Sequence, residues 1–262
     1  MIERAGFSAA YMSGFSLAAS VGKPDIGLLT MTDVLAHAKA IAQSVSIPLI
    51  ADADTGYGGL LNVIETVRCF EAAGIAGIQL EDQVTPKKCG ALAGKELVSI
   101  GLMQDKIRAA VAARTDPDFI IIGRTDALAN EGLDEALRRL KAWEEAGADA
   151  TMVLDLSEES QMRAVAAAAT RPTIMLPMSN LHQKISKLVT AQALEKMGFS
   201  MVIHPSILLL AMAAAHREVL KVLKADGGID RALPLFAPFS EINQVLDTEA
   251  IIAMGARFTT TN

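Results

Sequence analysis

Short apolar runs alternate with longer stretches of helical periodicity along most of this chain. Helices are indicated over 31–44, 103–114 and 133–146, and Thr30 with Asp33 forms a capping box before the first one. Each apolar run is continuous rather than alternating, which is typical of a parallel strand covered on both faces. Seven such runs predict strands at 9–12, 48–51, 77–80, 119–122, 151–154, 173–176 and 201–203.

The same helix-to-strand unit recurs four times along the chain. In each copy a helix ends at a glycine suited to a left-handed cap, and an apolar run follows: Gly6, Gly74, Gly147 and Gly198. Alternating helices and buried strands predict a parallel sheet and an α/β fold. Seven strands are one short of a closed (β/α)8 barrel, so we expect a gap between the first and last strands.

The length of 262 residues suits one large α/β domain. We therefore predict a single barrel domain over residues 1–262. Helices expected over 206–223 and near 241–254 exceed what a minimal barrel needs, and surplus helices commonly mediate subunit contacts. The segment 206–262 is accordingly predicted to serve in contacts between subunits.

Composition narrows the range of partners. A net charge of −6 without a cluster of Lys and Arg gives no electrostatic attraction for nucleic acid or an anionic membrane surface. The most apolar stretch, 207–215, is too short to cross a bilayer, and the charged N-terminal residues do not resemble a signal sequence, so we expect a cytoplasmic protein. Cys69 and Cys89 have no second pair, so reduced thiols and an oxygen-bound metal are expected.

Three of the predicted strands stop on charged residues. The carboxyl ends of parallel strands open onto the loops where α/β enzymes bind ligands, and a buried strand otherwise has no use for ionised groups. The pattern therefore predicts an enzyme whose acidic cluster holds a hard cation. The residues are Asp52 and Asp54, Glu81 and Asp82, and Arg124 and Asp126.

The first two of these strand ends predict a metal site. Asp52 and Asp54 are two residues apart and leave the same face of the chain, and Glu81 ends a neighbouring strand. Since Mg²⁺ keeps several waters, we expect Asp52 to bind it directly while Asp54 and Glu81 hold coordinated waters. Alternatively, Asp54 forms an Asx turn that caps the next helix, and Asp82 is a solvated acid at the surface.

Arg124 is placed to clamp a substrate carboxylate in the same cavity. A structural ion pair with Asp126 or Glu81 is an equally good interpretation, and one arrangement can serve both purposes.

The loop 85–94, TPKKCGALAG, follows the Glu81 strand and is basic and punctuated by glycine, so we expect it to close over a bound anion. Cys89 lies at its centre. The flanking Lys87 and Lys88 are expected to lower the pKa of the thiol and to favour proton exchange with a reacting carbon or oxygen.

The motifs ADADTGYGG, QLEDQ, PKKCG and GRTDA, in this order and spacing, resemble the isocitrate lyase and phosphoenolpyruvate mutase superfamily. The likeness is strongest to its short lyases that act on 2-methylisocitrate or 2,3-dimethylmalate, and it covers most of the chain from Tyr11 onward. It implies a TIM-type (β/α)8 barrel that depends on Mg²⁺, or on Mn²⁺ in its place. This chain lacks the first strand and helix of such relatives, and a homo-oligomer, dimer or tetramer, is implied.

The resemblance also implies roles for individual residues. Asp52, Asp54 and Glu81 correspond to the metal site, and Ser13, Gly14 and Arg124 to the groups that bind the α-oxycarboxylate of a small anionic substrate. Cys89 corresponds to the acid or base that acts on the departing enolate. The substrate-binding set is Tyr11, Ser13, Gly14, Asp25, Asp52, Gly90 and Arg124, and the catalytic set is Cys89, Arg124 and Lys88.

Three positions depart from the lyase pattern. Ala91 stands where the lyase loop has His, and Leu154 where a strand end has Glu, although Asp155 is adjacent. The segment IMLPMSN lacks the usual Asn-Met pair, so no substrate contact is assigned to Asn180. These departures predict a different and smaller distal substrate group.

The leading hypothesis is a Mg²⁺-dependent lyase that cleaves a 2-hydroxy di- or tricarboxylic acid through an enolate-like intermediate and releases pyruvate or another 2-oxo acid. The alternatives are oxaloacetate decarboxylation or hydrolysis, a phosphonopyruvate-type mutase, and a catalytically impaired paralogue that binds a 2-oxo acid. Fold alone does not separate them, because barrels host many reactions.

Overall fold

The computed structural model describes residues 1–177 and 189–258. Asn180 lies outside the described residues. Those that are described fall into two structural units, one of residues 2 and 6–206 and the other of residues 1, 3–5 and those from 207 onward.

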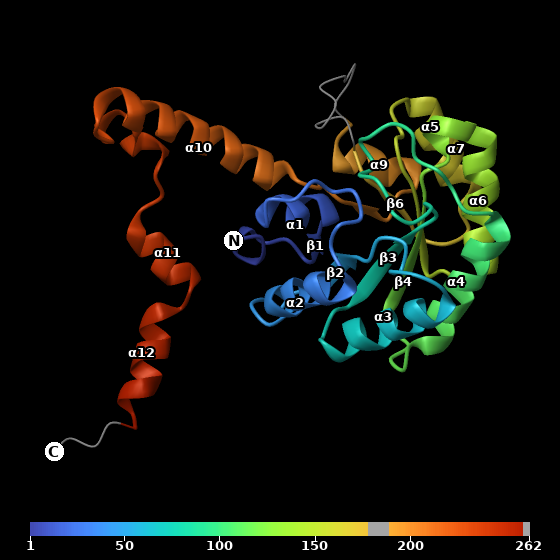
Figure 1. The fold of residues 1–262 in the computed structure, drawn as a ribbon, viewed down its shortest axis with the longest axis horizontal. Helices are drawn as coiled ribbons and strands as arrows, with labels where there is room; N and C mark the ends of the chain where they lie inside the picture. The colour runs from blue at the N-terminus through green and yellow to red at the C-terminus, as the bar shows by residue number, and fades with distance from the viewer. Residues whose placement is uncertain (178–188, 259–262) are drawn as a thin grey trace. The chain divides into compact units, whose positions relative to one another are not determined.

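The first unit is built on one parallel sheet whose strands are paired in sequence order. All seven predicted strands are confirmed, and β1 and β7 are the two edges of the sheet as described, so the expected gap is confirmed as well. Figure 1 shows the sheet curling into part of a barrel, with helices on its outer side. The strands are β1 (Ala10–Met12), β2 (Leu49–Asp52), β3 (Gly77–Glu81), β4 (Ile120–Thr125), β5 (Ala150–Val153), β6 (Thr173–Met175) and β7 (Met201–Val202).

The helices of this unit agree with the periodicity within a few residues. The predicted capping box is present, because Asp33 N–H donates to Thr30 Oγ1 at 3.3 Å and Thr30 N–H donates to Asp33 Oδ2 at 2.9 Å. One helix starts earlier than predicted, because Ser99 caps it by accepting from Leu102 N–H at 3.2 Å. The helices are α1 (Gly14–Ser20), α2 (Met31–Ala42), α3 (Leu60–Ala72), α4 (Ile100–Ala113), α5 (Leu128–Glu131), α6 (Leu133–Glu145), α7 (Glu159–Ala168) and α9 (Ala191–Met197).

The four glycines of the internal repeat adopt the left-handed backbone that the pattern predicts. Their φ angles are +85° at Gly6, +82° at Gly74, +101° at Gly147 and +109° at Gly198. This region of φ is open to glycine at little cost. Each glycine therefore ends a helical turn and redirects the chain toward the following strand.

The core lies between the sheet and its outer helices. Trp143 on α6 and Phe70 on α3 are fully buried there, as are Ile78 and Ile121 of the central strands. Gly123 makes room for the indole, since a Cβ at this position would lie 3.0 Å from Cβ of Trp143. Tight packing of this kind fixes where each strand ends and hence where the charged side chains stand.

The second unit is helical. It comprises α10 (Ile207–Asp226), α11 (Phe239–Val245) and α12 (Thr248–Ala256), with 3₁₀ turns at Glu3–Ala5 and Asp230–Leu235. Among the described residues, no helix combines the length and the apolar character that a membrane crossing requires.

One helix prediction in the second unit is wrong. The expected helix near 241–254 is two helices, because Asp247 adopts a left-handed φ of +51° and interrupts the α-helical path. Arg4 forms an ion pair with Asp247 at 3.1 Å and also donates to the carbonyl of Gln244, so the break is tied to the N-terminal turn. Use of this unit in subunit contacts remains a prediction.

Replacing Gly77 with Ala tests the close contact of β3 and β4. A Cβ at Gly77 would lie 2.7 Å from the carbonyl oxygen of Ile120. The backbone must shift to relieve this clash, so we expect Gly77→Ala to lower the free energy of unfolding by about 1–3 kcal/mol in a urea titration. Gly101→Ala is the control, because a Cβ there meets nothing within 4 Å, and it should be neutral or stabilising by up to about 1 kcal/mol. Equal stability of the two variants would contradict this packing.

Candidate active site

The charged ends of β2, β3 and β4 lie side by side. Asp52 is paired in register with Gln79, and Glu81 with Arg124, so the register itself brings these residues to one edge of the sheet. Asp52 is 7% exposed and Glu81 is 1% exposed. The predicted carboxylates therefore point into the protein rather than into bulk solvent.

Asp52 and Asp54 converge next to Gly14, at the start of α1. A Cβ at Gly14 would lie 3.1 Å from Asp52 Oδ2 and 3.4 Å from Asp54 Oδ1, so the two oxygens are close to each other. Asp52 Oδ2 accepts from Gly14 N–H at 3.3 Å, and Asp52 Oδ1 accepts from Gln79 Nε2 at 3.2 Å. This glycine leaves space for the two carboxylates, which a larger residue would fill.

Asp54 is held by a buried lysine. Lys87 Nζ lies 2.8 Å from Asp54 Oδ1 and 2.5 Å from Asp25 Oδ1. The contact with Asp54 is an ion pair, and among the described residues Asp54 Oδ1 has no hydrogen-bond partner. Burial raises the pKa of Asp54 to about 6, although Lys87 opposes the shift.

The alternative role of Asp54 as a helix cap is wrong. The next helix, α3, begins after Gly59, whose N–H donates to Asn62 Oδ1 at 3.0 Å. Asp54 has a left-handed φ of +49° and faces Lys87 instead.

Arg124 contacts two carboxylates and still has free donors. Its Nε and Nη2 donate to the two oxygens of Asp126, both at 2.9 Å, and its Nη1 lies 3.0 Å from Glu81 Oε2. A guanidinium has five N–H groups, so these three contacts leave two unused. Within residues 1–177 and 189–258, Glu81 Oε1 has no hydrogen-bond partner, and burial raises the pKa of Glu81 although Arg124 opposes it. Arg124 thus forms the predicted ion pairs with Asp126 and Glu81 and still has N–H donors that a ligand could use.

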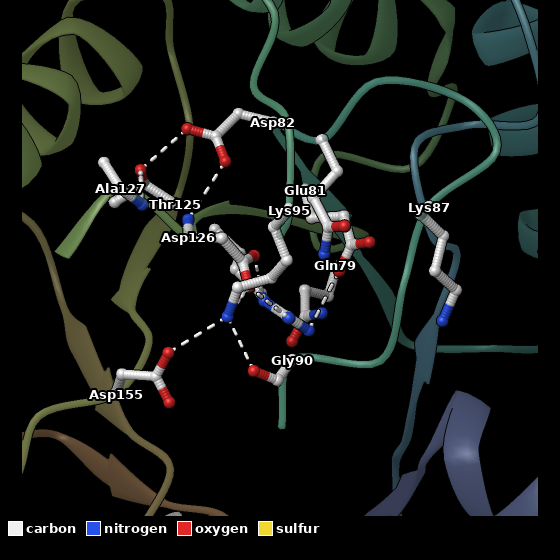
Figure 2. A network of polar contacts seen from close by, with 12 residues as sticks. Gln79, Glu81, Asp82, Lys87, Gly90, Lys95, Thr125, Asp126, Ala127 and Asp155 are labelled. Carbon is white, nitrogen blue, oxygen red and sulfur yellow. Dashed lines mark hydrogen bonds and ion pairs between the residues drawn. The ribbon is translucent and has the colours of Figure 1, made fainter. Parts of the chain in front are cut away.

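Asp82 is not a solvated surface acid, and that interpretation is wrong. It is fully buried and accepts from Thr125 Oγ1 at 2.7 Å, from Asp126 N–H at 3.0 Å and from Arg139 Nη1 at 3.1 Å. Figure 2 shows it beside Thr125 and Asp126. Asp82 therefore fixes the strand end from which Asp126 reaches the guanidinium of Arg124.

The site holds more carboxylates than cations. Lys87, Lys95 and Arg124 are its cations, and they are shared among five carboxylates, whereas Asp52 has no ion pair in the described part of the chain. Burial disfavours the ionised form of a carboxylate, which is the physical reason for the raised pKa values of Asp54 and Glu81 even though each faces a cation. Over residues 1–177 and 189–258, no three His, Cys, Asp or Glu side chains are arranged to hold a metal ion together. The six carboxylates are those of Asp25, Asp52, Asp54, Glu81, Asp126 and Asp155.

A cavity of about 40 Å³ opens beside these charges. It brings together most of the predicted substrate-binding residues with Cys89 of the predicted catalytic set. Gly14 lines a smaller adjoining space of about 10 Å³ together with Asp52 and Asp54. The larger cavity is lined by Tyr11, Ser13, Phe15, Asp25, Asp52, Lys87, Cys89, Gly90, Arg124, Leu154, Leu176, Pro205 and Ser206.

The predicted catalytic residue Lys88 does not line this cavity. Its side chain is exposed, and its Nζ donates to the carbonyl of Gly94 at 2.7 Å. Lys87 is the loop lysine that faces the carboxylates. Adjacent residues of an extended loop point in opposite directions, and the sequence alone does not indicate which of two lysines turns inward.

Two uncharged polar residues of the site were not predicted. Gln79 accepts from Tyr11 OH at 3.0 Å and donates to Asp52, so it links the phenol to the carboxylate. Its position two residues before Glu81 on one strand could have indicated a shared face. The hydroxyl of Ser206 lies 3.4 Å from that of Ser13. No motif or strand spacing in the sequence indicated Ser206 as a residue of the site.

The loop of Cys89 packs over the site, but the predicted effect on its thiol is wrong. Cys89 N–H donates to the carbonyl of Asp25 at 2.8 Å, and the side-chain amide of Gln83 makes two hydrogen bonds of 2.9 Å with the backbone of Lys88. Burial raises the pKa of Cys89, and this effect exceeds the opposing ones of a backbone hydrogen bond at Ala91 and of the charge of Lys87. The thiol is therefore kept protonated.

Comparison with known proteins places these features in a family. A family model described as phosphoenolpyruvate phosphomutase matches residues 1–224. The 2,3-dimethylmalate lyase of Eubacterium barkeri is 42% identical over 96% of this chain and 86% of its own. A phosphoenolpyruvate phosphomutase structure from Streptomyces platensis subsp. rosaceus has a TM-score of 0.91 and 33% identity, covering 98% of this chain and 89% of the other. A phosphonopyruvate hydrolase in complex with oxalate and Mg²⁺ has a TM-score of 0.87 and 37% identity, covering 98% and 88%.

Alkylation of Cys89 by iodoacetamide tests the raised pKa. In a Cys69→Ser background, only Cys89 can react. Because the thiolate is the reactive form, a raised pKa means that folded protein near pH 7 reacts several-fold more slowly than the same protein in urea. The rate should also keep rising at alkaline pH after that of the denatured protein has levelled off. Faster reaction in the folded protein near neutral pH would contradict the assignment.

Proposed function

Because the chain belongs to the phosphoenolpyruvate mutase and isocitrate lyase superfamily, we propose that it is a Mg²⁺-dependent carbon–carbon lyase. Its substrate would be a 2-hydroxy dicarboxylic acid of the 2,3-dimethylmalate type, and the product pyruvate or another 2-oxo acid. Relatives of similar identity include a lyase, a mutase and a hydrolase, so family membership does not fix the reaction. The observation that carries the proposal is a cysteine, Cys89, that shares one small cavity with Arg124 and Asp52 at the strand ends.

The residues present fit a divalent cation. Asp52 has no cationic partner among the described residues, and Asp54 Oδ1 and Glu81 Oε1 have no hydrogen-bond partner although both are buried. Asp52 would bind the ion directly, while Asp54 and Glu81 would hold its waters, which suits an ion that keeps much of its hydration shell. When bound, the ion supplies a Lewis acid for the substrate oxygens and offsets the excess negative charge.

Arg124 and Ser13 would bind the α-carboxylate and the neighbouring oxygen. Among the described residues that line this cavity, the two unused N–H groups of Arg124 form the only guanidinium donor set, and charge-assisted bonds of this kind are strong and directional. The guanidinium cannot turn away easily, because Asp126 holds it at two points. Its position is thus set before the substrate arrives, which lowers the cost of ordering the site.

Cys89 would act as the general acid of the cleavage. When the 2-hydroxyl group transfers its proton to a water molecule, C2 forms a carbonyl and the bond between C2 and C3 breaks. The electron pair passes to C3 and its carboxylate as an enolate, and the thiol proton of Cys89 is transferred to C3. The thiolate left on Cys89 then takes up a proton from solvent, so no net proton is gained or lost. A raised thiol pKa serves this step because the proton must be present at neutral pH.

The apolar part of the cavity lining suits a short alkyl group. It consists of Phe15, Leu154, Leu176 and Pro205. Lys87 is already shared by two carboxylates, so a third carboxylate on the substrate would meet no free cation among the described lining residues. This supports a dimethylmalate-type substrate over a tricarboxylate.

Release of a 2-oxo acid from 2,3-dimethylmalate, coupled to a lactate dehydrogenase assay, tests the proposal. We expect turnover with Mg²⁺, loss of at least about 10²-fold after EDTA treatment, and recovery on adding Mg²⁺ or Mn²⁺. 2-Methylisocitrate should be cleaved more slowly. No product from either acid, or products from oxaloacetate or phosphonopyruvate only, would contradict a lyase.

Cys89→Ser tests the general acid. Serine is a much weaker acid than the thiol, so kcat should fall by about 10²–10⁴-fold while KM changes little. Cys69→Ser is the matched control, since Cys69 lies on α3 and does not line the cavity; its kcat should stay within about twofold of the parent. An active Cys89→Ser variant would exclude this role.

A further inference from the structure

We infer that Lys95 is a positioning residue that holds the Cys89 loop closed by joining it to the carboxylates that orient Arg124. This inference rests on the proposed function for its catalytic meaning, but the closure itself is testable without turnover. Lys95 lies in the turn that follows the loop, and its side chain is only 2% exposed. Neither the charge pattern nor the family motifs identified it.

The ammonium group of Lys95 joins three segments of the chain. Its Nζ donates to the carbonyl of Gly90 at 2.6 Å and to Asp155 Oδ2 at 3.0 Å, and it lies 3.2 Å from Asp126 Oδ1. Figure 2 shows the nitrogen between Asp155 and Gly90. Two of its three N–H donors make these hydrogen bonds, and its charge is also paired with Asp126. The Cys89 loop, the end of β4 and the residues after β5 are thereby tied to one atom.

Burying a lysine without partners is expensive, so this arrangement is stable only while its acceptors are in place. The backbone of Lys95 is also fixed, because Asn130 Nδ2 donates to its carbonyl at 2.6 Å. The backbone of Lys95 is therefore held in place by the segment that follows β4. On the side of the loop, the contact is the Gly90 carbonyl, which belongs to the residue immediately after Cys89.

Closure of the loop brings Gly90 against the substrate-binding side chains. A Cβ at Gly90 would lie 2.8 Å from Arg124 Nη2 and 2.3 Å from Leu154 Cδ2. The loop backbone thus rests on the guanidinium and on the apolar wall of the cavity.

Asp126 extends the connection to the substrate-binding arginine. The same oxygen, Asp126 Oδ1, accepts from Arg124 Nη2 and forms the ion pair with Lys95. Loss of the ammonium would therefore release the loop and leave Asp126 with a single cation. Both effects would displace the general acid relative to the substrate.

The test is the alkylation rate of Cys89 by iodoacetamide in Cys69→Ser protein that also carries Lys95→Met. Methionine keeps the length and apolar stem but removes the three donors. We expect the rate to rise by about tenfold or more, because the loop opens locally. Lys95→Arg retains the charge, so its alkylation rate should stay close to that of the parent. A general loss of stability would not separate these two variants in this way.

Arg114→Met is the matched control for stability. Arg114 also binds a carbonyl and a carboxylate, those of Phe119 at 2.7 Å and Asp149 at 2.5 Å, but it does not line the cavity. Its alkylation rate should remain within about twofold of the parent. Equal rates for Lys95→Met and Arg114→Met would overturn the inference.

Asp155→Asn is the second variant, for use if Lys95→Met does not fold. It removes one charged acceptor of Lys95 and should raise the alkylation rate by a smaller factor; an unchanged rate would also overturn the inference. If the protein proves to be an active lyase, Lys95→Met should lower kcat more than it raises KM. Absence of lyase activity together with faster alkylation would refute the proposed function and leave the closure intact.

Discussion

Compensation of buried charge at the carboxyl ends of parallel strands is the constraint on which the rest of this structure depends. Covered strands place their backbone in an apolar layer, so an ionised side chain at their ends must find a partner. Here the partners come from other strand ends and from one loop: Arg124 for Glu81 and Asp126, and Lys87 for Asp54. The ion pairs of Lys87 with Asp54 and of Arg124 with Glu81 join segments that are distant in sequence, so the contacts that neutralise the site also hold parts of the fold together.

The sequence predicted the strands and glycine caps well, because both are local. A continuous apolar run and a glycine with positive φ need no knowledge of the rest of the chain, and the strand-end acids follow from them. What could not be predicted depends on packing: which of Lys87 and Lys88 faces inward, and the direction of the shift in the pKa of Cys89. The break at Asp247 was missed for the same reason, since the helical pattern continues through it.

The thiol illustrates how burial overrides nearby charge. Counting charges in the sequence places two lysines beside Cys89 and predicts a lowered pKa for its thiol. In the structure one lysine is exposed and the other is engaged by Asp25 and Asp54, so its field at the sulfur is largely offset. Desolvation then decides the outcome and raises the pKa, which favours the neutral thiol. The direction of the shift is thus the opposite of the one that the neighbouring charges predict.

Relatives with the same barrel include a lyase, a mutase and a hydrolase, so the shared strand ends cannot be what separates their reactions. In the proposed mechanism, those ends would hold a cation and position an arginine, and both would stabilise an oxyanion. The reaction would then depend on other groups of the cavity, and in this chain these include the thiol of Cys89 and the apolar side chain of Leu154. Both residues lie outside the strands, Cys89 in the loop after β3 and Leu154 directly after β5. Under this proposal, the contacts that hold the Cys89 loop in place matter as much as the residues that would touch the substrate.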